Sequence, residues 1–181
     1  TILSSDEQQR IRLSWEGGGS GQHHFIRGFP PELISQVRPY DLLIVDDLQS
    51  ELVKSPEFTS VFTKYAHHTP LTCLYLCQNL FHRSDGEARS RSLSASYLCL
   101  TRSIRDRTVV QNLGKQMFPK KSNFLVRVYE DATNNKPYSY LFIDLRQETP
   151  DFLRLRTGIF PGDKHLAYVS EESMPQPRGI L

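Results

Sequence analysis

The pattern of apolar and polar positions predicts a strand–helix–strand unit in the first half of the chain. Residues 42–45 and 71–77 are compact apolar runs without polar alternation, a pattern that favours strands buried on both faces. Between them, apolar residues recur at helical spacing over 48–66, with Pro56 as a point where the helix would break. A single helix between two such strands is typical of a right-handed parallel crossover. We therefore expect the strands at 42–46 and 71–77 to be parallel.

Other segments predict further elements on both sides of this unit. A short extended run at 24–27 and a short helix at 31–36 come before it, and an Arg-rich loop at 82–92 follows it. Beyond that loop, the pattern predicts strands at 95–100 and 138–145, helices at 105–117 and 123–132, and an edge strand at 152–157. The whole set predicts an α/β fold with a mostly parallel sheet and flanking helices.

The composition is that of one globular domain with loose ends. The chain has 181 residues, 38% of them hydrophobic and 23% charged, and its longest apolar run is far shorter than the ~20 residues of a membrane span. We expect a domain at 23–161, after a flexible Gly-rich segment at 1–22 and before a polar tail at 162–181, disordered from 171. Three cysteines make no disulfide framework, and the adjacent histidine pairs do not have metal-ligand spacing. These features predict reduced thiols in an intracellular protein without a membrane partner.

Two adjacent acids, Asp46 and Asp47, follow the first apolar strand, and Gln78 ends the second. Ligands of open parallel sheets sit at the carboxyl ends of the strands, so these side chains would meet at one edge. An acid there can hold a Mg²⁺-bound water, and a second can polarise an attacking water. The alternative is an ordinary buried strand whose acids cap the next helix.

Arginine dominates the basic residues. Lys and Arg number 22 against 20 Asp and Glu, so the net charge of +2 indicates little, but 15 of the 22 are Arg. Arg favours bidentate contacts to phosphate and carboxylate. Six arginines fall within 83–107, which is either a solvated loop and helix start or a surface that contacts phosphate.

Several short blocks resemble the packaging-type ATPases of Maverick/Polinton-like elements and related DNA viruses, in the FtsK/HerA-like branch of P-loop NTPases. The resemblance covers roughly residues 24–161. The blocks, in order, are residues 42–48, Phe62-Thr63-Lys64-Tyr65-Ala66-His67-His68, 77–81, Arg105-Asp106, 116–119, 130–133, 137–141 and Leu153-Arg154-Leu155-Arg156-Thr157.

The resemblance implies a RecA-like core that assembles as a homo-oligomeric ring and uses ATP and Mg²⁺ to pump double-stranded DNA into a capsid. Asp46 would be the Mg²⁺-associated acid, Asp47 the acid that activates water, and Gln78 the γ-phosphate sensor. Arg89 would be the arginine finger, with Arg91 as its alternative. Capsid portal or vertex proteins would be further partners, at a virion-assembly site in the nucleus or cytoplasm.

The chain departs from the family at the phosphate loop. It contains no G-x-x-x-x-G-K-[ST] motif, and residues 17–22, Gly-Gly-Gly-Ser-Gly-Gln, have the glycines without the Lys or the hydroxyl. We expect a C-terminal part of a motor subunit that lacks the first strand and the phosphate loop and is inactive alone. The alternatives are a degenerate, non-enzymatic module that binds DNA or a ring partner, and a helicase-type relative.

Overall fold

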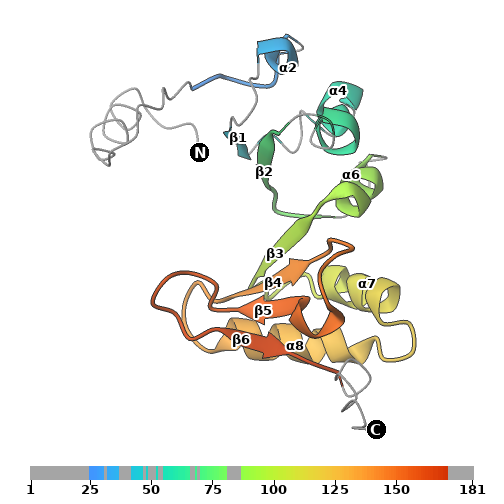
Figure 1. The fold of residues 1–181 in the computed structure, drawn as a ribbon, viewed down its shortest axis with the longest axis vertical. Coiled ribbons are helices and arrows are strands. Elements are labelled where there is room, and N and C mark those ends of the chain that lie inside the picture. Colours follow the sequence, from blue (N-terminus) through green and yellow to red (C-terminus); the bar gives the residue numbers. More distant parts are fainter. Residues whose placement is uncertain are drawn as a thin grey trace, which may run out of the picture. The chain divides into compact units, whose positions relative to one another are not determined.

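A computed structural model shows two compact units (Figure 1). One comprises residues 1–78 with 82–90, and the other comprises 79–81 with 91–181. The structure describes residues 25–30, 32–36, 42–46, 48, 52, 55–65, 68, 70–80 and 87–170. No helix in these ranges is long and apolar enough to cross a membrane.

The first unit is built on a parallel pair of strands. Strand β1 (Leu42–Asp46) pairs in parallel with β2 (Thr72–Leu76), which confirms the predicted parallel direction of the two strands. Helix α4 (Pro56–Ser60) lies between them in the chain and continues into a π-helical segment, η1 (Val61–Tyr65). Helix α4 begins at Pro56, the residue predicted as a break, because proline fits the first helical turn. Ser55 caps the helix, since its Oγ accepts a hydrogen bond from the Phe58 amide at 3.1 Å.

One face of the β1–β2 pair forms an aromatic core. Val45 and Phe58 are buried, and the Phe58 ring makes edge contacts with Tyr75 and Phe62 at centroid distances of 5.0 and 5.4 Å. A short helix, α2 (Leu33–Gln36), lies earlier in the same unit.

The opposite face of this pair is exposed and apolar. Side chains alternate along a strand, so Leu42 and Ile44 of β1 share that face with Leu74 and Leu76 of β2, and they are 59, 55, 46 and 44% exposed. The prediction of two strands buried on both faces is therefore wrong for this structure.

The second unit is an antiparallel sheet with a helical hairpin. Its four strands lie in the order β3-β4-β5-β6, and each pairs antiparallel with the next. Their bounds are β3 Tyr97–Thr101, β4 Tyr140–Asp144, β5 Leu155–Thr157 and β6 Leu166–Tyr168. Helices α7 (Thr108–Met117) and α8 (Asn123–Asn134) connect β3 to β4, and a 3₁₀ turn, η2 (Asp151–Leu153), precedes β5. Helix α6 (Ala88–Ser94) precedes β3 and crosses the boundary between the units.

The hairpin covers one face of this sheet. Leu125 of α8, Leu141 and Ile143 of β4, and Leu155 of β5 are at most 1% exposed and form one cluster with residues of α7. Figure 1 shows the two helices on the same side of β3–β6. Gly114 permits the tight link between them, because a Cβ there would overlap the Ser122 carbonyl oxygen.

The prediction of a mostly parallel sheet is wrong for the described residues, where only β1 and β2 are parallel. One helix between two strands returns the chain to the starting end, so the next strand runs parallel. Two antiparallel helices return it to the opposite end, so β4 runs against β3. The structure is mixed α/β, and the RecA-like core stays a prediction.

Smaller predictions also differ from the structure. Residues 25–27 of the run expected at 24–27 form no strand, and the loop expected at 82–92 contains the start of α6. The helix expected from 105 begins at Thr108. The strand expected at 152–157 is β5 alone, and it is internal because β6 pairs with it. Strand β6 itself lies in the range 162–181, where we expected only a polar tail.

Candidate functional site

The carboxyl end of the parallel pair carries two of the predicted site residues. Asp46 is the last residue of β1 and lies opposite Leu76, and Gln78 follows two residues after Leu76. Both side chains are exposed. Parallel pairing places the ends of the two strands at the same edge, as the sequence predicted. This acid–amide edge, defined by Asp46 and Gln78, is one candidate site.

The other predicted catalytic residues are not joined to this edge by the described structure. Asp47 lies outside the described residues, and so do residues 17–22. Arg89 is an exposed residue of α6 in the same unit, whereas Arg91 is 5% exposed and belongs to the second unit. An arginine finger must reach a neighbouring subunit, so exposure favours Arg89 over Arg91 as the candidate.

The described donor set suits only part of a Mg²⁺ site. Carboxylate oxygens are typical ligands of Mg²⁺, and Asp46 offers such a group, whereas the amide of Gln78 can donate to a phosphate oxygen. Within the ranges that the structure describes, no group of three His, Cys, Asp or Glu residues could hold a metal ion. In the acid–amide edge, Asp46 could therefore hold one side of a metal site, with phosphate oxygens and waters as the remaining ligands.

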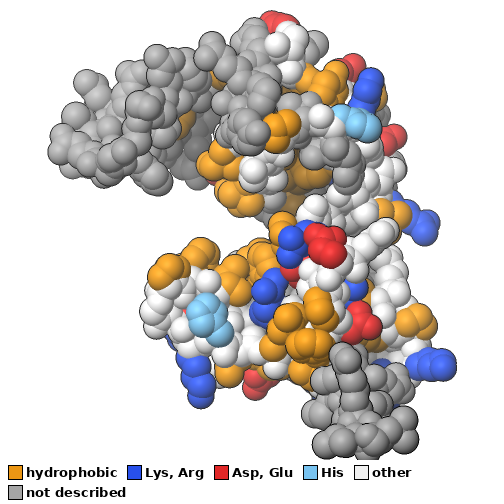
Figure 2. Space-filling model, viewed as in Figure 1, with side chains coloured by type: hydrophobic (Ala, Val, Ile, Leu, Met, Phe, Trp, Pro, Cys, Tyr) orange, Lys and Arg blue, Asp and Glu red, His pale blue; other side chains and the backbone are white. Residues whose placement is uncertain are grey.

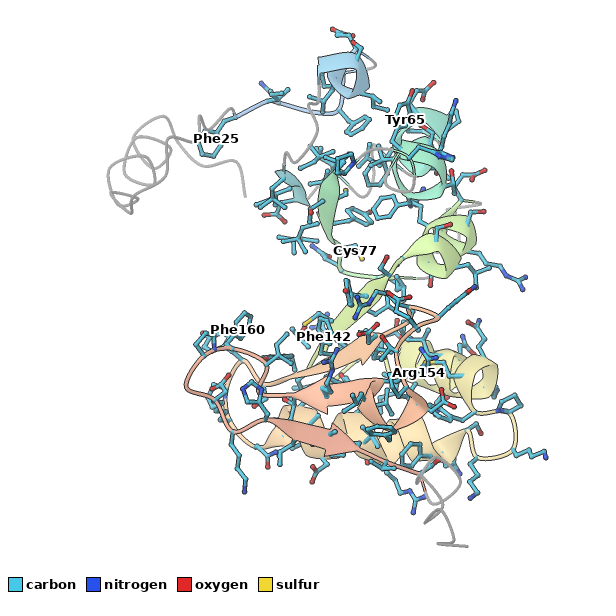
Figure 3. The ribbon with its side chains drawn as sticks, viewed as in Figure 1. Phe25, Tyr65, Cys77, Phe142, Arg154 and Phe160 are labelled. Atoms are coloured by element: carbon cyan, nitrogen blue, oxygen red, sulfur yellow. The ribbon has the colours of Figure 1, made fainter. Side chains whose placement is uncertain are left out.

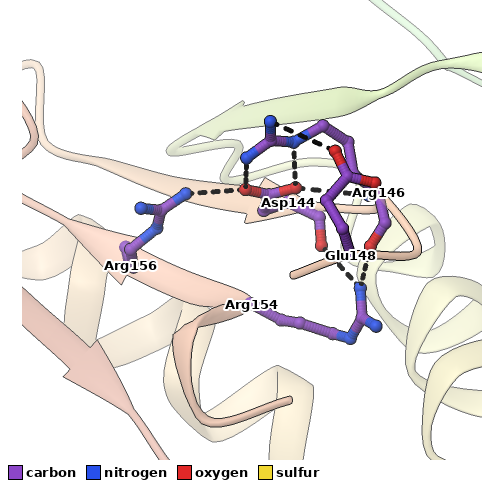
Figure 4. Close-up of polar contacts among 5 residues, drawn as sticks. All are labelled: Asp144, Arg146, Glu148, Arg154 and Arg156. Carbon is purple, nitrogen blue, oxygen red and sulfur yellow. Dashed lines mark hydrogen bonds and ion pairs between the residues drawn. The ribbon is translucent and has the colours of Figure 1, made fainter. Parts of the chain in front are cut away.

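A second constellation surrounds a fully buried acid at the end of β4. Asp144 has 0% exposure, and Figure 4 shows three arginines around it. Arg146 donates from Nε and Nη2 to the two carboxylate oxygens at 3.1 and 3.0 Å, and Arg156 Nη2 donates to Oδ2 at 2.9 Å. Two guanidinium groups thus share one carboxylate, a geometry in which charge-assisted hydrogen bonds are strong.

The third arginine holds the backbone around the acid. Arg154 Nη1 donates to the carbonyl oxygens of Asp144 and Arg146 at 3.3 and 2.8 Å, and its Nε donates to Asp151 at 2.7 Å. Burial by itself would raise the pKa of the Asp144 carboxyl, but the hydrogen bonds from Arg146 hold that pKa below its usual value. The carboxylate is therefore ionised at neutral pH and fixes the positions of the guanidinium groups.

The two carboxylate-bound guanidinium groups also lie over aromatic rings. Arg146 is 5.1 Å from the ring centroid of Tyr97, and Arg156 is 5.3 Å from that of Phe142. The two rings are 5.3 Å apart with planes 32° from each other. They are diagonal neighbours on β3 and β4, since Tyr97 lies opposite Asp144, and both are on the sheet face opposite the helical hairpin. We name this group of five residues, Tyr97, Phe142, Asp144, Arg146 and Arg156, the arginine–aromatic cluster.

The sequence contained a signal for this cluster that the prediction did not use. Asp144 is the single charge in the apolar run of β4, and a charge in a buried strand requires a partner. Arg154 and Arg156 alternate with leucines in the segment that was predicted as the next strand, so they were candidate partners for that acid. The pairing between β4 and β5 was needed to connect the two segments.

Comparison of the chain with family models, with curated proteins and with solved structures finds no significant match.

Proposed function

We propose that the chain is part of an ATP-hydrolysing motor subunit of the kind that packages double-stranded DNA, and that it contributes the metal-binding edge of the nucleotide site. The observation that carries the proposal is the parallel register of β1 and β2, which puts Asp46 and Gln78 at one edge of the sheet. The assignment of ATP to this edge rests on the resemblance of the short sequence blocks to those of ATP-hydrolysing motors. Ring partners, duplex DNA and capsid proteins follow from the same resemblance.

Each polar residue then has a separate task in the proposed site. Asp46 would hold a water bound to Mg²⁺, and Asp47 would accept a proton from the attacking water. Gln78 would donate from its amide to the γ-phosphate. Arg89 would reach the nucleotide of a neighbouring subunit in the ring, where the developing negative charge needs a cation. Bound ATP supplies the phosphoryl group and its leaving oxygen.

The 181-residue chain alone should bind Mg-ATP weakly. The Lys and the Ser or Thr of a phosphate loop are absent from its sequence. Charge-assisted hydrogen bonds contribute about 1.5–3 kcal/mol each, so the loss of three lowers affinity about a thousandfold or more. Calorimetric titration with Mg-ATP measures this directly, and micromolar binding would contradict the proposed division of the site.

Hydrolysis is tested in the longest product of the gene that contains this chain. If its reading frame carries a phosphate loop ahead of residue 23, we expect Mg²⁺-dependent ATP turnover. Asp47→Asn should then stop turnover and keep ATP binding, whereas Asp46→Asn should weaken the Mg²⁺-dependent part of binding. Glu57→Gln is the matched control, because Glu57 is an exposed acid in the first turn of α4.

Mixed assemblies test the role of Arg89. Arg89→Ala subunits should bind nucleotide without turnover, and mixing them with Asp47→Asn subunits should restore part of the rate. One interface then contains both intact groups. Restoration with Arg91→Ala in place of Arg89→Ala would move the finger by two residues.

A second function is favoured by one observation, the missing phosphate-loop lysine. A non-enzymatic module that binds DNA or a ring partner would need no phosphate loop. A reading frame without such a loop, together with a product that binds DNA and does not turn over ATP, would support this module and contradict the motor.

A further inference from the structure

The antiparallel sheet of the second unit has one open face. The helical hairpin covers the face that carries Leu141 and Ile143, and alternation puts Tyr140, Phe142 and Asp144 of β4 on the other. The register adds Tyr97 of β3, opposite Asp144, to this open face. In Figure 2, hydrophobic and Lys or Arg side chains adjoin on this side of the unit, with Asp or Glu side chains beside some of the basic ones.

Exposed aromatic rings are the first notable property of the open face. Tyr97 is 44% exposed, although it lies in the middle of the arginine–aromatic cluster. Phe160, in the turn after β5, is 60% exposed and makes an edge contact with Tyr140 at 5.7 Å. Figure 3 shows Phe142 on β4 and Phe160 on the loop toward β6. The face thus offers planar surfaces at two places along the sheet.

Arginines with unused hydrogen-bond capacity are the second property. Arg156 donates one side-chain hydrogen bond within the described part of the chain, to Asp144, and its side chain is 32% exposed. Arg146 is 40% exposed while it lies over Tyr97, and its Nη1 also pairs with the exposed Glu148 at 3.4 Å. A guanidinium group has five N–H donors. The Nε of Arg156 is buried and that of Arg146 is bound to Asp144, so the donors left for an outside acceptor are on the terminal nitrogens. Their planar outer sides also continue the stacking surface of the rings below them.

The charge of this part of the chain favours an anionic partner. Residues 91–181 contain 14 Lys and Arg against 9 Asp and Glu, a net charge of +5. Residues 1–90 contain 8 against 11, a net charge of −3. The small total of +2 therefore hides a basic second unit, and Asp144, at 0% exposure, presents no carboxylate oxygen to the surface.

We propose that the open face of β3–β6 binds single-stranded nucleic acid. Unpaired bases stack on Tyr97 and on the guanidinium groups over Tyr97 and Phe142, and phosphate oxygens accept hydrogen bonds from Arg146 and Arg156. Asp144 positions both arginines and touches no nucleotide. A duplex encloses the faces of its bases, so exposed rings on a sheet favour a single strand. This inference does not depend on the proposed ATPase function, whose partner is duplex DNA.

Fluorescence anisotropy with the full 181-residue chain tests this proposal. The probes are a labelled 12-nucleotide oligothymidine and a labelled 12-base-pair duplex. We expect the single strand to bind more tightly than the duplex, with affinity that falls as salt rises because phosphate contacts release counterions. Tyr97→Leu should weaken binding about tenfold, because it removes the stacking surface of one base. Tyr97→Phe retains an aromatic ring and should bind like the parent chain.

Charge variants separate the cluster from the general basic character. Arg156→Gln should weaken binding of the single strand about tenfold, whereas Arg127→Gln, on the exposed side of α8, should change it less than twofold. Circular dichroism melting of every variant checks that it is folded. If Arg156→Gln does not fold, the comparison of Tyr97→Leu with Tyr97→Phe still tests the proposal. Equal affinity for the duplex, or equal affinity of Tyr97→Leu and Tyr97→Phe, would overturn the proposal. So would a polyglutamate peptide that displaces the oligothymidine at equal charge concentration, since the face would then recognise only negative charge.

Discussion

The two sheets of this protein differ in the side chains that they carry on the face that no helix covers. On β1–β2, that face carries three leucines and an isoleucine that are 44–59% exposed, together with the exposed Thr72 and Asp46. On β3–β6, it carries rings and arginines organised around a buried carboxylate, with Asp144 bound by two guanidinium groups. The apolar side chains of the first face can gain free energy only by further burial. The second holds its carboxylate in hydrogen bonds, leaves the buried Nε of Arg156 without a partner in the described part of the chain, and exposes an aromatic ring and parts of two guanidinium groups to water.

The largest expected effect concerns the buried carboxylate of the second sheet. Asp144→Ala leaves Arg146 and Arg156 without their shared acceptor, and breaking a buried ion pair costs about 3–5 kcal/mol. Native-state hydrogen exchange should show faster exchange of the β4 and β5 amides, with little change in β1 and β2. Asp151→Ala is the control, because its carboxylate is 71% exposed and an exposed pair contributes about 0–1 kcal/mol. Equal losses for the two variants would contradict the role given to burial.

The second largest effect on stability is expected at the tight link between α7 and α8. Gly→Ala inside a helix normally stabilises by about 1 kcal/mol. At Gly114, the added methyl group would overlap the Ser122 carbonyl oxygen, so we expect a loss of about 1–3 kcal/mol instead. Chemical denaturation followed by circular dichroism measures the sign. Gln111→Ala, at an exposed position of the same helix, should cause no loss of this kind.

Acid should affect the second unit through the same carboxylate. The folded pKa of Asp144 lies below its usual value, so its contribution to stability is present above the unfolded pKa of about 3.9 and is lost as pH falls through the folded pKa. The exchange rates of β4 amides, corrected for intrinsic pH effects, should therefore be steady from pH 7 to about 5 and rise below about 4. Asp144→Asn should remove this rise. If the Asp144→Asn variant shows the same rise in exchange rates at low pH, the titrating group is not Asp144.

The smallest effect on stability is expected at the exposed face of the first sheet. Leu74→Thr replaces a side chain that is 46% exposed with one that also suits a strand, so the free energy of unfolding should change by about 0.5 kcal/mol or less. Binding of a hydrophobic dye should nevertheless fall, because the apolar face becomes smaller. The same substitution at Leu141, which is 0% exposed, should destabilise strongly. Similar effects at the two positions would show that the exposed face is buried in solution.

The local elements could be predicted from the sequence better than their pairing. The bounds of β1 and β2 are correct to within one residue, because a compact apolar run is a local signal and one helix between two strands decides their relative direction. The direction of β4 could also have been derived, since two helices were predicted between 105 and 132. The position of the acid–amide edge could be predicted from these local signals. The arginine–aromatic cluster did not, because it joins three strands whose order depends on contacts between distant segments.

Strand β6 shows how little local signal a real strand can have. Its three residues, Leu166 to Tyr168, follow Gly158 and Gly162, both at positive φ, in a segment that is mostly polar. Pairing with β5 decides its conformation, and Tyr168 adds a hydrogen bond from its hydroxyl to Asp131 at 2.7 Å. Propensity alone therefore assigned the segment to a tail.

The helical hairpin also has a consequence for the order in which the second unit folds. Strands β3 and β4 are separated by 38 residues along the chain, and closing a loop of that length as random coil carries a large entropy cost before any strand pair forms. The α7–α8 hairpin needs only the short link from Phe118 to Ser122, so its contacts are local and should form first. Once formed, it brings the ends of the two strands near each other and shortens the search for their register. Pulse-labelled hydrogen exchange should therefore protect α7 and α8 before β3 and β4, and β6, whose pairing completes the sheet, should be protected last.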